Sequence, residues 1–265
     1  MDESLSISAC IIAFNEADMI RDCLESVAWA DEIVVVDSGS TDETVAIAEG
    51  YGCRVVHQDF LGHVKQKDLA VRLASNRWVF CLDADERLEG GGAEEVRRAL
   101  ADDAGRTAGY FFPRRTFYLG GWVEHGGWWP EYRLRLFDRD RGRWGGVDPH
   151  DHVAVDGTTR RLRSKIDHYN YRNIAHHMEK VNTYTTTMAA GKDGAGERAS
   201  LAKLLFNPTG RFVRMYFLKQ GFRDGVKGFI LAVIAAFYVF LKYAKLWERQ
   251  KIETPGRRGG KEPPE

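Results

Sequence analysis

The sequence predicts an α/β fold on a mostly parallel sheet, followed by a C-terminal segment of helices. Three observations lead to this prediction. Short apolar runs alternate with stretches of helical periodicity through about the first 90 residues. These runs are apolar on both faces, as in a parallel sheet that helices cover on both sides. Beyond residue 173 the apolar residues fall mainly at helical spacing.

Four strands and three helices are expected in the first part of the chain. The strands are apolar and rich in β-branched residues, whereas the helices place apolar residues three and four positions apart. In order, they are strand 8–14, helix 19–27, strand 32–36, helix 42–48, strand 54–57, helix 64–74 and strand 78–82. The turn 38–41, Ser-Gly-Ser-Thr, signals the start of the second helix.

The rest of the chain changes character twice. Residues 110–144 lose the periodicity and contain 11 Phe, Tyr or Trp residues, among them four of the seven tryptophans. We expect a helix over 173–190, a glycine-rich break over 191–196 and two helical stretches within 201–251. Residues 253–265 are rich in Pro, Gly and charge, which predicts a disordered tail.

Composition excludes several classes of protein. A chain of 265 residues is long enough for a buried core, so it is no small disulfide-stabilised scaffold. With 38 Lys and Arg against 38 Asp and Glu, no overall charge points to nucleic acid as a partner. The four cysteines lack C-x-x-C spacing, which favours reduced thiols in a cytoplasmic protein. Residues 1–8 contain neither a basic nor a long apolar region, so we expect no signal peptide.

Polar side chains follow three of the predicted strands. Asn15 and Glu16 come after the first strand, Asp37 after the second, and Asp83 and Asp85 after the fourth. In open parallel sheets, ligands bind beyond the carboxyl ends of the strands. These side chains are therefore expected to share one site.

The strongest local motif is Asp83-Ala84-Asp85, which places two carboxylates one residue apart at the end of an apolar strand. Such oxygen ligands suit Mg²⁺ or Mn²⁺, and the same ion can hold a diphosphate. A surface turn with solvated acids, or a helix N-cap, is the structural alternative. The motif is a weak signal alone and gains weight from its neighbours.

Three motifs together resemble the nucleotide-sugar-binding half of family 2 glycosyltransferases, which have the GT-A fold. They are the runs 11–16, 34–42 and 82–86, in the family's order and approximate spacing. The specific resemblance covers about the first hundred residues. It implies a GT-A domain over 1–175, with a donor half over 1–100 and an acceptor half over 101–175.

This resemblance implies roles for the motif residues. Ala13, Asn15 and Glu16 would line the pocket for the base and ribose, and Asp37 would accept a hydrogen bond from either group. Asp83 and Asp85 would serve the sugar and a divalent metal, Mg²⁺ or Mn²⁺. Taken alone, Asp37 could instead only cap the turn that follows it.

An inverting transfer also needs a carboxylate near the attacking hydroxyl of the acceptor. Asp148 and Asp151 are the candidates. The family often shows a His followed by an acid here, and His150-Asp151 matches with Asp in place of the more usual Glu, so we favour Asp151 as the base. His168 resembles the histidine that completes the metal shell in many GT-A enzymes, although a buried, hydrogen-bonded histidine is an equal alternative.

The aromatic middle of the chain suits an acceptor saccharide, because aromatic rings stack on sugar faces. Trp128 and Trp129 are the candidate stacking residues, with His150 nearby in the sequence. Alternation predicts that Leu134, Leu136 and Tyr132 face the core, with Arg133 and Arg135 on the other face of the strand. These arginines could meet a phosphorylated acceptor or the diphosphate, or lie on a solvated strand face.

The C-terminal segment combines positive charge with apolar surface. Residues 198–251 hold 11 Lys and Arg against 2 acids, a net charge of +9. The uncharged stretch 228–241 has 14 residues and would span about 21 Å as a helix, short of the roughly 20 residues that cross a bilayer. We therefore expect a helix that lies in one leaflet between flanking lysines. Packing against the catalytic domain or another subunit is the alternative.

The sequence as a whole predicts a GT-A (Rossmann-like) catalytic domain, a basic helical segment over 176–252 that associates with a membrane, and a tail over 253–265. The closest resemblance is to the lipopolysaccharide inner-core β-glucosyltransferase branch of the family. It implies a metal-dependent hexosyltransferase, peripheral or monotopic on the inner face of the cytoplasmic membrane. The enzyme would move a sugar from UDP-glucose or a similar nucleotide sugar to a lipid-linked saccharide.

Two rival functions share the donor half. A transferase acting on polyprenyl phosphate or a polyprenyl-linked glycan would carry the same first hundred residues. A non-catalytic nucleotide-binding membrane adaptor would be expected to lose the paired aspartates or the acid near residue 151, and both are present. A nucleotidyltransferase is disfavoured, because no glycine-rich phosphate loop with a basic residue follows the first strand.

Overall fold

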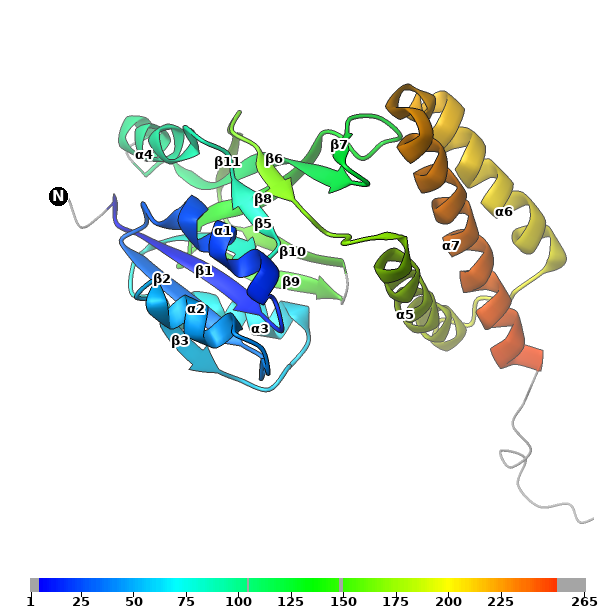
Figure 1. The fold of residues 1–265 in the computed structure, drawn as a ribbon, viewed down its shortest axis with the longest axis horizontal. Helices are drawn as coiled ribbons and strands as arrows, with labels where there is room; N and C mark the ends of the chain where they lie inside the picture. The colour runs from blue at the N-terminus through cyan, green and yellow to red at the C-terminus, as the bar shows by residue number, and fades with distance from the viewer. Residues whose placement is uncertain (1–4, 104, 148–149, 252–265) are drawn as a thin grey trace, which may run out of the picture. The chain divides into compact units, whose positions relative to one another are not determined.

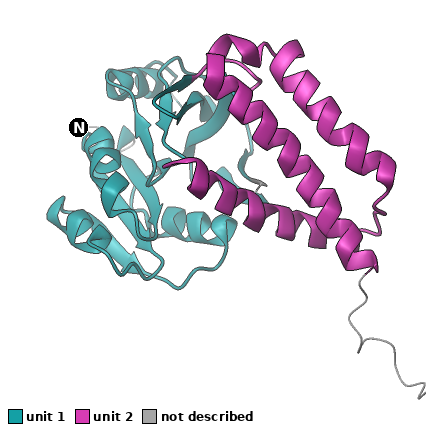
Figure 2. Ribbon diagram, turned by 45° about the vertical axis from the view of Figure 1, so that its right-hand side comes forward, with its two compact units in different colours: residues 1–122, 128–170 teal, residues 123–127, 171–265 magenta. Residues whose placement is uncertain are grey.

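The structure, a computed structural model, describes residues 5–103, 105–147 and 150–251, without the side chains of Val147 and His150. Two of the sequence predictions, Asp148 as an alternative base and the tail 253–265, lie outside the described residues. The chain divides into two compact units, shown in different colours in Figure 2. One contains residues 1–122 and 128–170, and the other contains residues 123–127 and 171–265.

The first unit is built around a ten-stranded mixed sheet, whose strands are labelled in Figure 1. The strand order is β3-β2-β1-β4-β8-β6-β12-β5, with β7 and β11 also paired to β6. Strand β1 is parallel to β2 and β4, and β2 is parallel to β3, whereas β8 runs antiparallel to both β4 and β6. The strands are β1 (Ile7–Ala13), β2 (Glu32–Asp37), β3 (Arg54–His57), β4 (Trp78–Asp83), β5 (Glu86–Leu88), β6 (Thr107–Tyr118), β7 (Gly121–Val123), β8 (Glu131–Asp138), β11 (Thr158–Arg161) and β12 (Ile166–His168).

Four helices accompany this sheet: α1 (Ala17–Val27), α2 (Thr44–Gly50), α3 (His63–Leu73) and α4 (Gly92–Asp103). Successive side chains of β1 pack into two different hydrophobic cores, because side chains alternate between the two faces of a strand. Ile7 and Ile11 pack with α1 and α4, whereas Cys10 packs with Val71 of α3. The predicted alternation of strand and helix is confirmed, and the four predicted strands lie within one residue of the observed bounds. The four cysteines are free thiols, as expected.

A separate two-stranded sheet is formed by β9 (Gly142–Val147) and β10 (His150–Val155). Its register places Asp151 opposite Gly146. Trp144 of this hairpin is buried in the same core cluster as Ala70 and Val71 of α3. The hairpin therefore packs against the helix that precedes β4.

In its described residues, up to Lys251, the second unit contains three helices, α5 (Ile174–Gly194), α6 (Leu201–Val213) and α7 (Gly225–Lys251), with a π-helical turn η2 (Arg214–Leu218) and a 3₁₀ turn η3 (Gly221–Asp224) before α7. The predicted break over 191–196 starts too early, because α5 continues to Gly194. Glycine costs a helix only about 1 kcal/mol, so Gly191 does not end it. The chain leaves the helix at Gly196, whose φ is 74°.

Helix α7 is longer than the uncharged stretch 228–241 suggested. Within the described residues, the helical run Gly221–Lys251 is long and apolar enough, by length and composition alone, to cross a membrane. Lys227 and Lys242 flank the uncharged stretch, whereas the helix continues through the charged residues that follow. Its apolar residues are largely unburied within the second unit, since only 28% of the most apolar window is buried.

Residues 123–127 belong to the second unit because Asp224 holds them there. The backbone N–H groups of Glu124 and His125 donate to the Asp224 carboxylate at 3.2 and 2.9 Å. Nδ1 of His125 lies 2.9 Å from Oδ1 of Asp224. Gly126 donates its N–H to the carbonyl oxygen of Lys219 at 2.8 Å. A short loop from the middle of the sequence is thus bound to the turns before α7.

Candidate functional site

The turns after β1 and β2 are joined at the carboxyl edge of the sheet. Asn15 has a φ of 53°, in the left-handed region that Asn tolerates. Its N–H donates to Oγ of Ser40 at 2.8 Å, and its Oδ1 accepts the N–H of Thr41 at 2.8 Å. The N–H of Glu16 donates to Oγ1 of Thr44 at 2.8 Å. The first two predicted motifs therefore form one connected structure.

Asp37 is buried and caps its own turn. Its Oδ2 accepts the N–H groups of Gly39 and Ser40 at 2.8 and 2.9 Å, and its Oδ1 accepts the hydroxyl of Ser40 at 2.5 Å. This is the capping contact that the sequence offered as an alternative, and a nucleoside bound there would share these oxygens. Ala13 lies directly opposite Asp37 in the parallel register, with its side chain buried.

Asp85 and His168 are brought together from segments far apart in the sequence. Strand β12 pairs with β5, and the N–H of Tyr169 donates to the carbonyl oxygen of Asp85 at 2.9 Å. Nε2 of His168 then lies 3.5 Å from Oδ2 of Asp85. The other ring nitrogen, Nδ1, is buried and has no hydrogen-bond partner among the described residues. The predicted histidine is thus buried, with one nitrogen facing a carboxylate of the paired aspartates.

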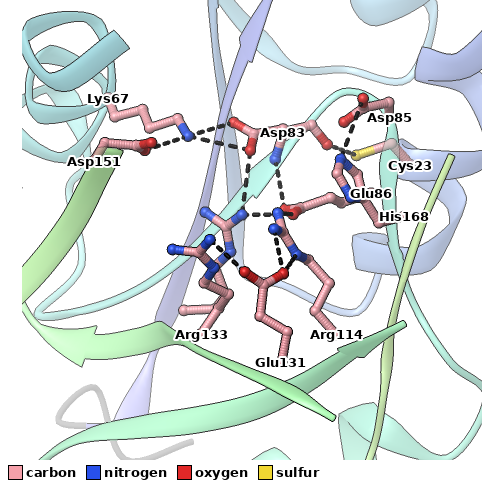
Figure 3. A network of polar contacts seen from close by, with 11 residues as sticks. Cys23, Lys67, Asp83, Asp85, Glu86, Arg114, Glu131, Arg133, Asp151 and His168 are labelled. Atoms are coloured by element: carbon pink, nitrogen blue, oxygen red, sulfur yellow. Dashed lines mark hydrogen bonds and ion pairs between the residues drawn. The ribbon is translucent and has the colours of Figure 1, made fainter. Parts of the chain in front are cut away.

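Asp83 is held by two buried cations, Lys67, which Figure 3 labels, and Arg135. Nζ of Lys67 lies 2.8 Å from its Oδ1, and an Nη of Arg135 donates to its Oδ2 at 3.2 Å. Burial alone would raise the pKa of Asp83, but Lys67 and Arg135 outweigh it and hold the pKa below its usual range. Asp83 is therefore ionised, and the charges of Lys67 and Arg135 compensate its negative charge.

Asp151 joins the same network from the hairpin. Nζ of Lys67 donates to Oδ2 of Asp151 at 2.7 Å, so one ammonium group links Asp151 to Asp83 (Figure 3). Burial raises the pKa of Asp151 and the positive charge of Lys67 lowers it, with a net shift downward. The predicted base therefore lies one side chain away from the aspartates after β4.

The network extends to charged residues on β6 and β8. Glu86 accepts from Arg135 at 2.5 Å and from Arg114 at 2.9 Å, and Glu131 accepts from Arg114 and Arg133 at 2.5 Å each. Arg135 is 3% exposed, so a solvated strand face is wrong for this residue. The reason is that its ion pairs with Glu86 and Asp83 compensate the cost of burial.

The residues fit a metal bound by two protein ligands. No group of three or more His, Cys, Asp or Glu side chains in the described part of the chain is arranged to hold a metal ion. Asp85 and His168 offer one carboxylate and one imidazole, a donor set that suits Mn²⁺ or a similar ion. An ion bound there would have coordination positions left for diphosphate oxygens and water.

The acceptor residues predicted from the sequence lie on the connection between β7 and β8, on β8 and on the β9–β10 hairpin. Trp128 and Trp129 are half-buried in the connection between β7 and β8. His150 is described by its backbone alone, which pairs with Val147. Leu134 and Leu136 are buried as predicted, whereas Tyr132 is exposed, with the Arg161 guanidinium 4.4 Å from its ring centroid.

Sequence reasoning missed two features. Lys67 lies on the buried side of α3, and its position among Gln66, Ala70 and Val71 is the signal that could have identified it. The rings of Phe117, Trp122 and Tyr169 meet at centroid distances of 5.1 to 5.7 Å. These rings come from three separate segments, so no local pattern joined them.

Comparison with known proteins identifies the family. The model of the family described as Glycosyl transferase family 2 matches residues 8–161, which is more than half of the chain. The chain belongs to glycosyltransferase family 2. The resemblance expected from the three motifs is confirmed, and the protein is a transferase of the glycosyl group.

Relatives of this family 2 glycosyltransferase match it over nearly its whole length. The lipopolysaccharide core biosynthesis glycosyltransferase LpsC of Rhizobium meliloti is 32% identical over 266 residues, covering 96% of each chain. An uncharacterized glycosyltransferase of Rickettsia conorii is 31% identical over 261 residues, covering 94% of this chain and 93% of its own. The predicted resemblance to enzymes of the lipopolysaccharide core is thus confirmed.

A solved structure shows the fold. The mannosyltransferase PcManGT from Pyrobaculum calidifontis, in complex with GDP-Man and Mn²⁺, has a TM-score of 0.53 at 14% identity. The match covers 91% of this chain and 86% of that one. At this identity the likeness speaks for the fold, and the predicted GT-A architecture of the family 2 glycosyltransferase is confirmed.

Proposed function

We propose that this family 2 glycosyltransferase is an inverting, metal-dependent hexosyltransferase that glycosylates a lipid-linked saccharide such as a lipopolysaccharide core. The observation that carries the proposal is the bridge from Asp83 through Lys67 to Asp151. It brings a carboxylate at the end of β4, on the predicted donor side, next to a carboxylate of the β9–β10 hairpin, on the predicted acceptor side. The LpsC relative supports the lipopolysaccharide core as the acceptor class.

The donor would lie along the carboxyl edge of the sheet. The joined turns after β1 and β2, with Asn15, Glu16 and Asp37, would hold the base and ribose of UDP-glucose or a similar nucleotide sugar. Asp83 would hold the sugar, with Lys67 and Arg135 keeping its carboxylate ionised. This placement follows the general rule for ligands of open α/β sheets.

Asp85 and His168 would hold the divalent metal. A bound Mg²⁺ or Mn²⁺ neutralises the charge that develops on the departing diphosphate. The Mn²⁺ in the complex of the mannosyltransferase with the same fold supports a divalent metal as cofactor. Nε2 of His168 faces Asp85 at 3.5 Å, so both donor atoms can reach one ion.

Asp151 would remove the proton from the attacking hydroxyl of the acceptor. The acceptor oxygen forms a bond to the anomeric carbon from the side opposite the diphosphate, and the bond from that carbon to the diphosphate oxygen breaks. The electron pair of the broken bond leaves on the nucleoside diphosphate, so the anomeric configuration inverts. The positive charge of Lys67 outweighs burial and lowers the pKa of Asp151, so the carboxylate is ionised at neutral pH and can accept a proton, as a weaker base than an unpaired aspartate.

The second unit would bind the inner face of the membrane, where a lipid-linked acceptor resides. Large apolar side chains of α6, the turns and α7 are exposed, among them Phe206, Leu218 and Val226, each above 70%. Basic residues such as Arg211 and Arg214 lie between them in the sequence. Apolar surface interleaved with positive charge is typical of helices that lie in the interface of an anionic membrane.

A label-transfer experiment tests the proposed function. The purified protein is incubated with labelled UDP-glucose and Mn²⁺, and with either lipopolysaccharide core lipid or polyprenyl phosphate. We expect label in the core lipid. Label in polyprenyl phosphate alone would favour the rival acceptor class, and hydrolysis or transfer with none of a panel of nucleotide sugars would favour a non-catalytic adaptor.

A further inference from the structure

Lys67 is a buried cation whose position depends on its partners. It lies on α3 among the buried residues Gln66, Ala70 and Val71, and its side chain is 8% exposed. Burying an ammonium group is unfavourable unless carboxylates compensate it. The partners of Lys67 are Asp83 and Asp151, and they come from two different sheets. The lysine is thus an ion-pair link between the ten-stranded sheet and the hairpin.

Lys67 holds one of the two carboxylate oxygens of Asp151. Its Nζ donates to Oδ2 at 2.7 Å. No hydrogen bond to Oδ1 is formed by the residues that the structure describes. A carboxylate that acts as a base needs a fixed orientation and a lone pair directed at the hydroxyl. The contact with Lys67 fixes the orientation of the carboxylate and does not use the lone pairs of Oδ1.

Trp144 restrains Lys67 from the side of the hairpin. The Nζ atom lies 4.8 Å from the centroid of the Trp144 ring, within the range of a cation–π contact. Trp144 is itself buried and packs with the core that α3 contributes to. The ammonium group is therefore confined by two carboxylates and one aromatic face.

We propose that Lys67 is the positioning residue that fixes the Asp151 carboxylate beside the donor for removal of the acceptor proton. This inference rests on the proposed function. In the transfer, the acceptor O–H bond breaks and its proton moves to Oδ1 of Asp151, while the acceptor oxygen bonds to the anomeric carbon. The bond to the diphosphate breaks with its electron pair on the leaving group. Lys67 keeps its proton throughout and takes part in this proton transfer only through Asp151.

A double-mutant cycle on the full chain tests this role. The variants are Lys67→Met, Asp151→Asn and the double variant, with Lys65→Met on the exposed side of α3 as the matched control. We expect Lys67→Met to lower kcat on the order of a hundredfold, with the donor KM changed by less than about threefold. In the Asp151→Asn background, the same change should lower kcat by less than about twofold, because the two residues act as a unit. Lys65→Met should match the wild type.

If thermal unfolding shows that Lys67→Met destabilises the fold, Lys67→Arg replaces it in the experiment. It keeps the buried charge but moves the donor atoms, so kcat should fall on the order of tenfold, again with little further loss in the Asp151→Asn background. Two results overturn the inference while leaving the proposed function intact: a Lys67→Met enzyme with the wild-type kcat, or losses that multiply in the double variant. Wild-type protein without transfer to any acceptor overturns the proposed function, and the inference with it.

Discussion

At the scale of single residues, Asp85 and His168 come from distant segments and form a pair of possible metal ligands. Asp85→Ala should abolish turnover without unfolding the protein, because Asp85 lies in a turn and its removal leaves the diphosphate charge unneutralised. Excess chelator should do the same to the wild type, and added Mn²⁺ should restore it. Both are measured as release of nucleoside diphosphate, with circular dichroism as the control for folding. Full activity in excess chelator would contradict the metal proposal.

His177 on α5 gives the second unit a pH-dependent stability. Burial lowers the pKa of His177 from 6.5 to about 4, and the nearby Lys180 and His176 add to the effect. The folded state therefore binds fewer protons than the unfolded state between these values. Stability should be fully present well above pH 6.5 and fall by roughly 2 kcal/mol as the pH drops to 5.

Urea unfolding at pH 7 and pH 5 measures this effect. His177→Gln should remove most of the difference in unfolding free energy between the two pH values, whereas His57→Gln, at an exposed imidazole, should retain it. A His177→Gln protein with the full wild-type pH dependence would assign the effect to other groups.

At the scale of elements, the loop 123–127 is fixed by one carboxylate of the η3 turn. Asp224→Ala removes the acceptor of two backbone N–H groups and of the His125 ring. We expect a loss of about 1–3 kcal/mol in the free energy of unfolding, with faster hydrogen exchange at residues 124–126. Glu248→Ala, the other acid within 198–251 and an exposed one, should change neither quantity. Unchanged exchange in Asp224→Ala would show that the loop is held by other contacts.

The sheet and the paired aspartates could be predicted because their signals are local. Each of the first four strands is a short continuous apolar run, and Asp83 and Asp85 are adjacent to the strand that positions them. The partners of Lys67 are 16 and 84 residues away, and a lysine on a helix usually indicates a solvated face. Arg135 was placed on the correct strand but not in the interior, because only the fold brings Glu86 to it.

The lengths of the C-terminal helices could not be predicted from the sequence either. Charged residues marked the ends of the apolar stretch 228–241, but charge does not end a helix, and α7 continues to Lys251. Likewise Gly191 did not end α5, since a helix can continue through a glycine. The pattern of side chains therefore predicted that these helices exist. It did not predict where they end, because the backbone hydrogen bonds determine the ends.

At the scale of the whole molecule, the exposed apolar side chains of the second unit predict attachment to anionic membranes. The full chain should sediment with anionic liposomes, and salt should weaken the binding without abolishing it, because apolar burial adds to charge attraction. Phe206→Asp together with Leu218→Asp should reduce the bound fraction at least severalfold, since both side chains are above 70% exposed. Leu119→Asp, in the first unit, is the control. Equal sedimentation of all three proteins would contradict membrane binding through this surface.

We propose that the chain transfers a sugar from a nucleotide sugar to a lipid-linked saccharide with Asp151 as the base. The most direct measurement is nucleoside diphosphate release from a panel of nucleotide sugars, with and without core lipid, by the wild type and by Asp151→Asn. We predict release by the wild type that requires the lipid, and a rate on the order of a hundredfold lower for Asp151→Asn at unchanged donor affinity. Lipid-independent release, or equal rates for the two proteins, would contradict the claim.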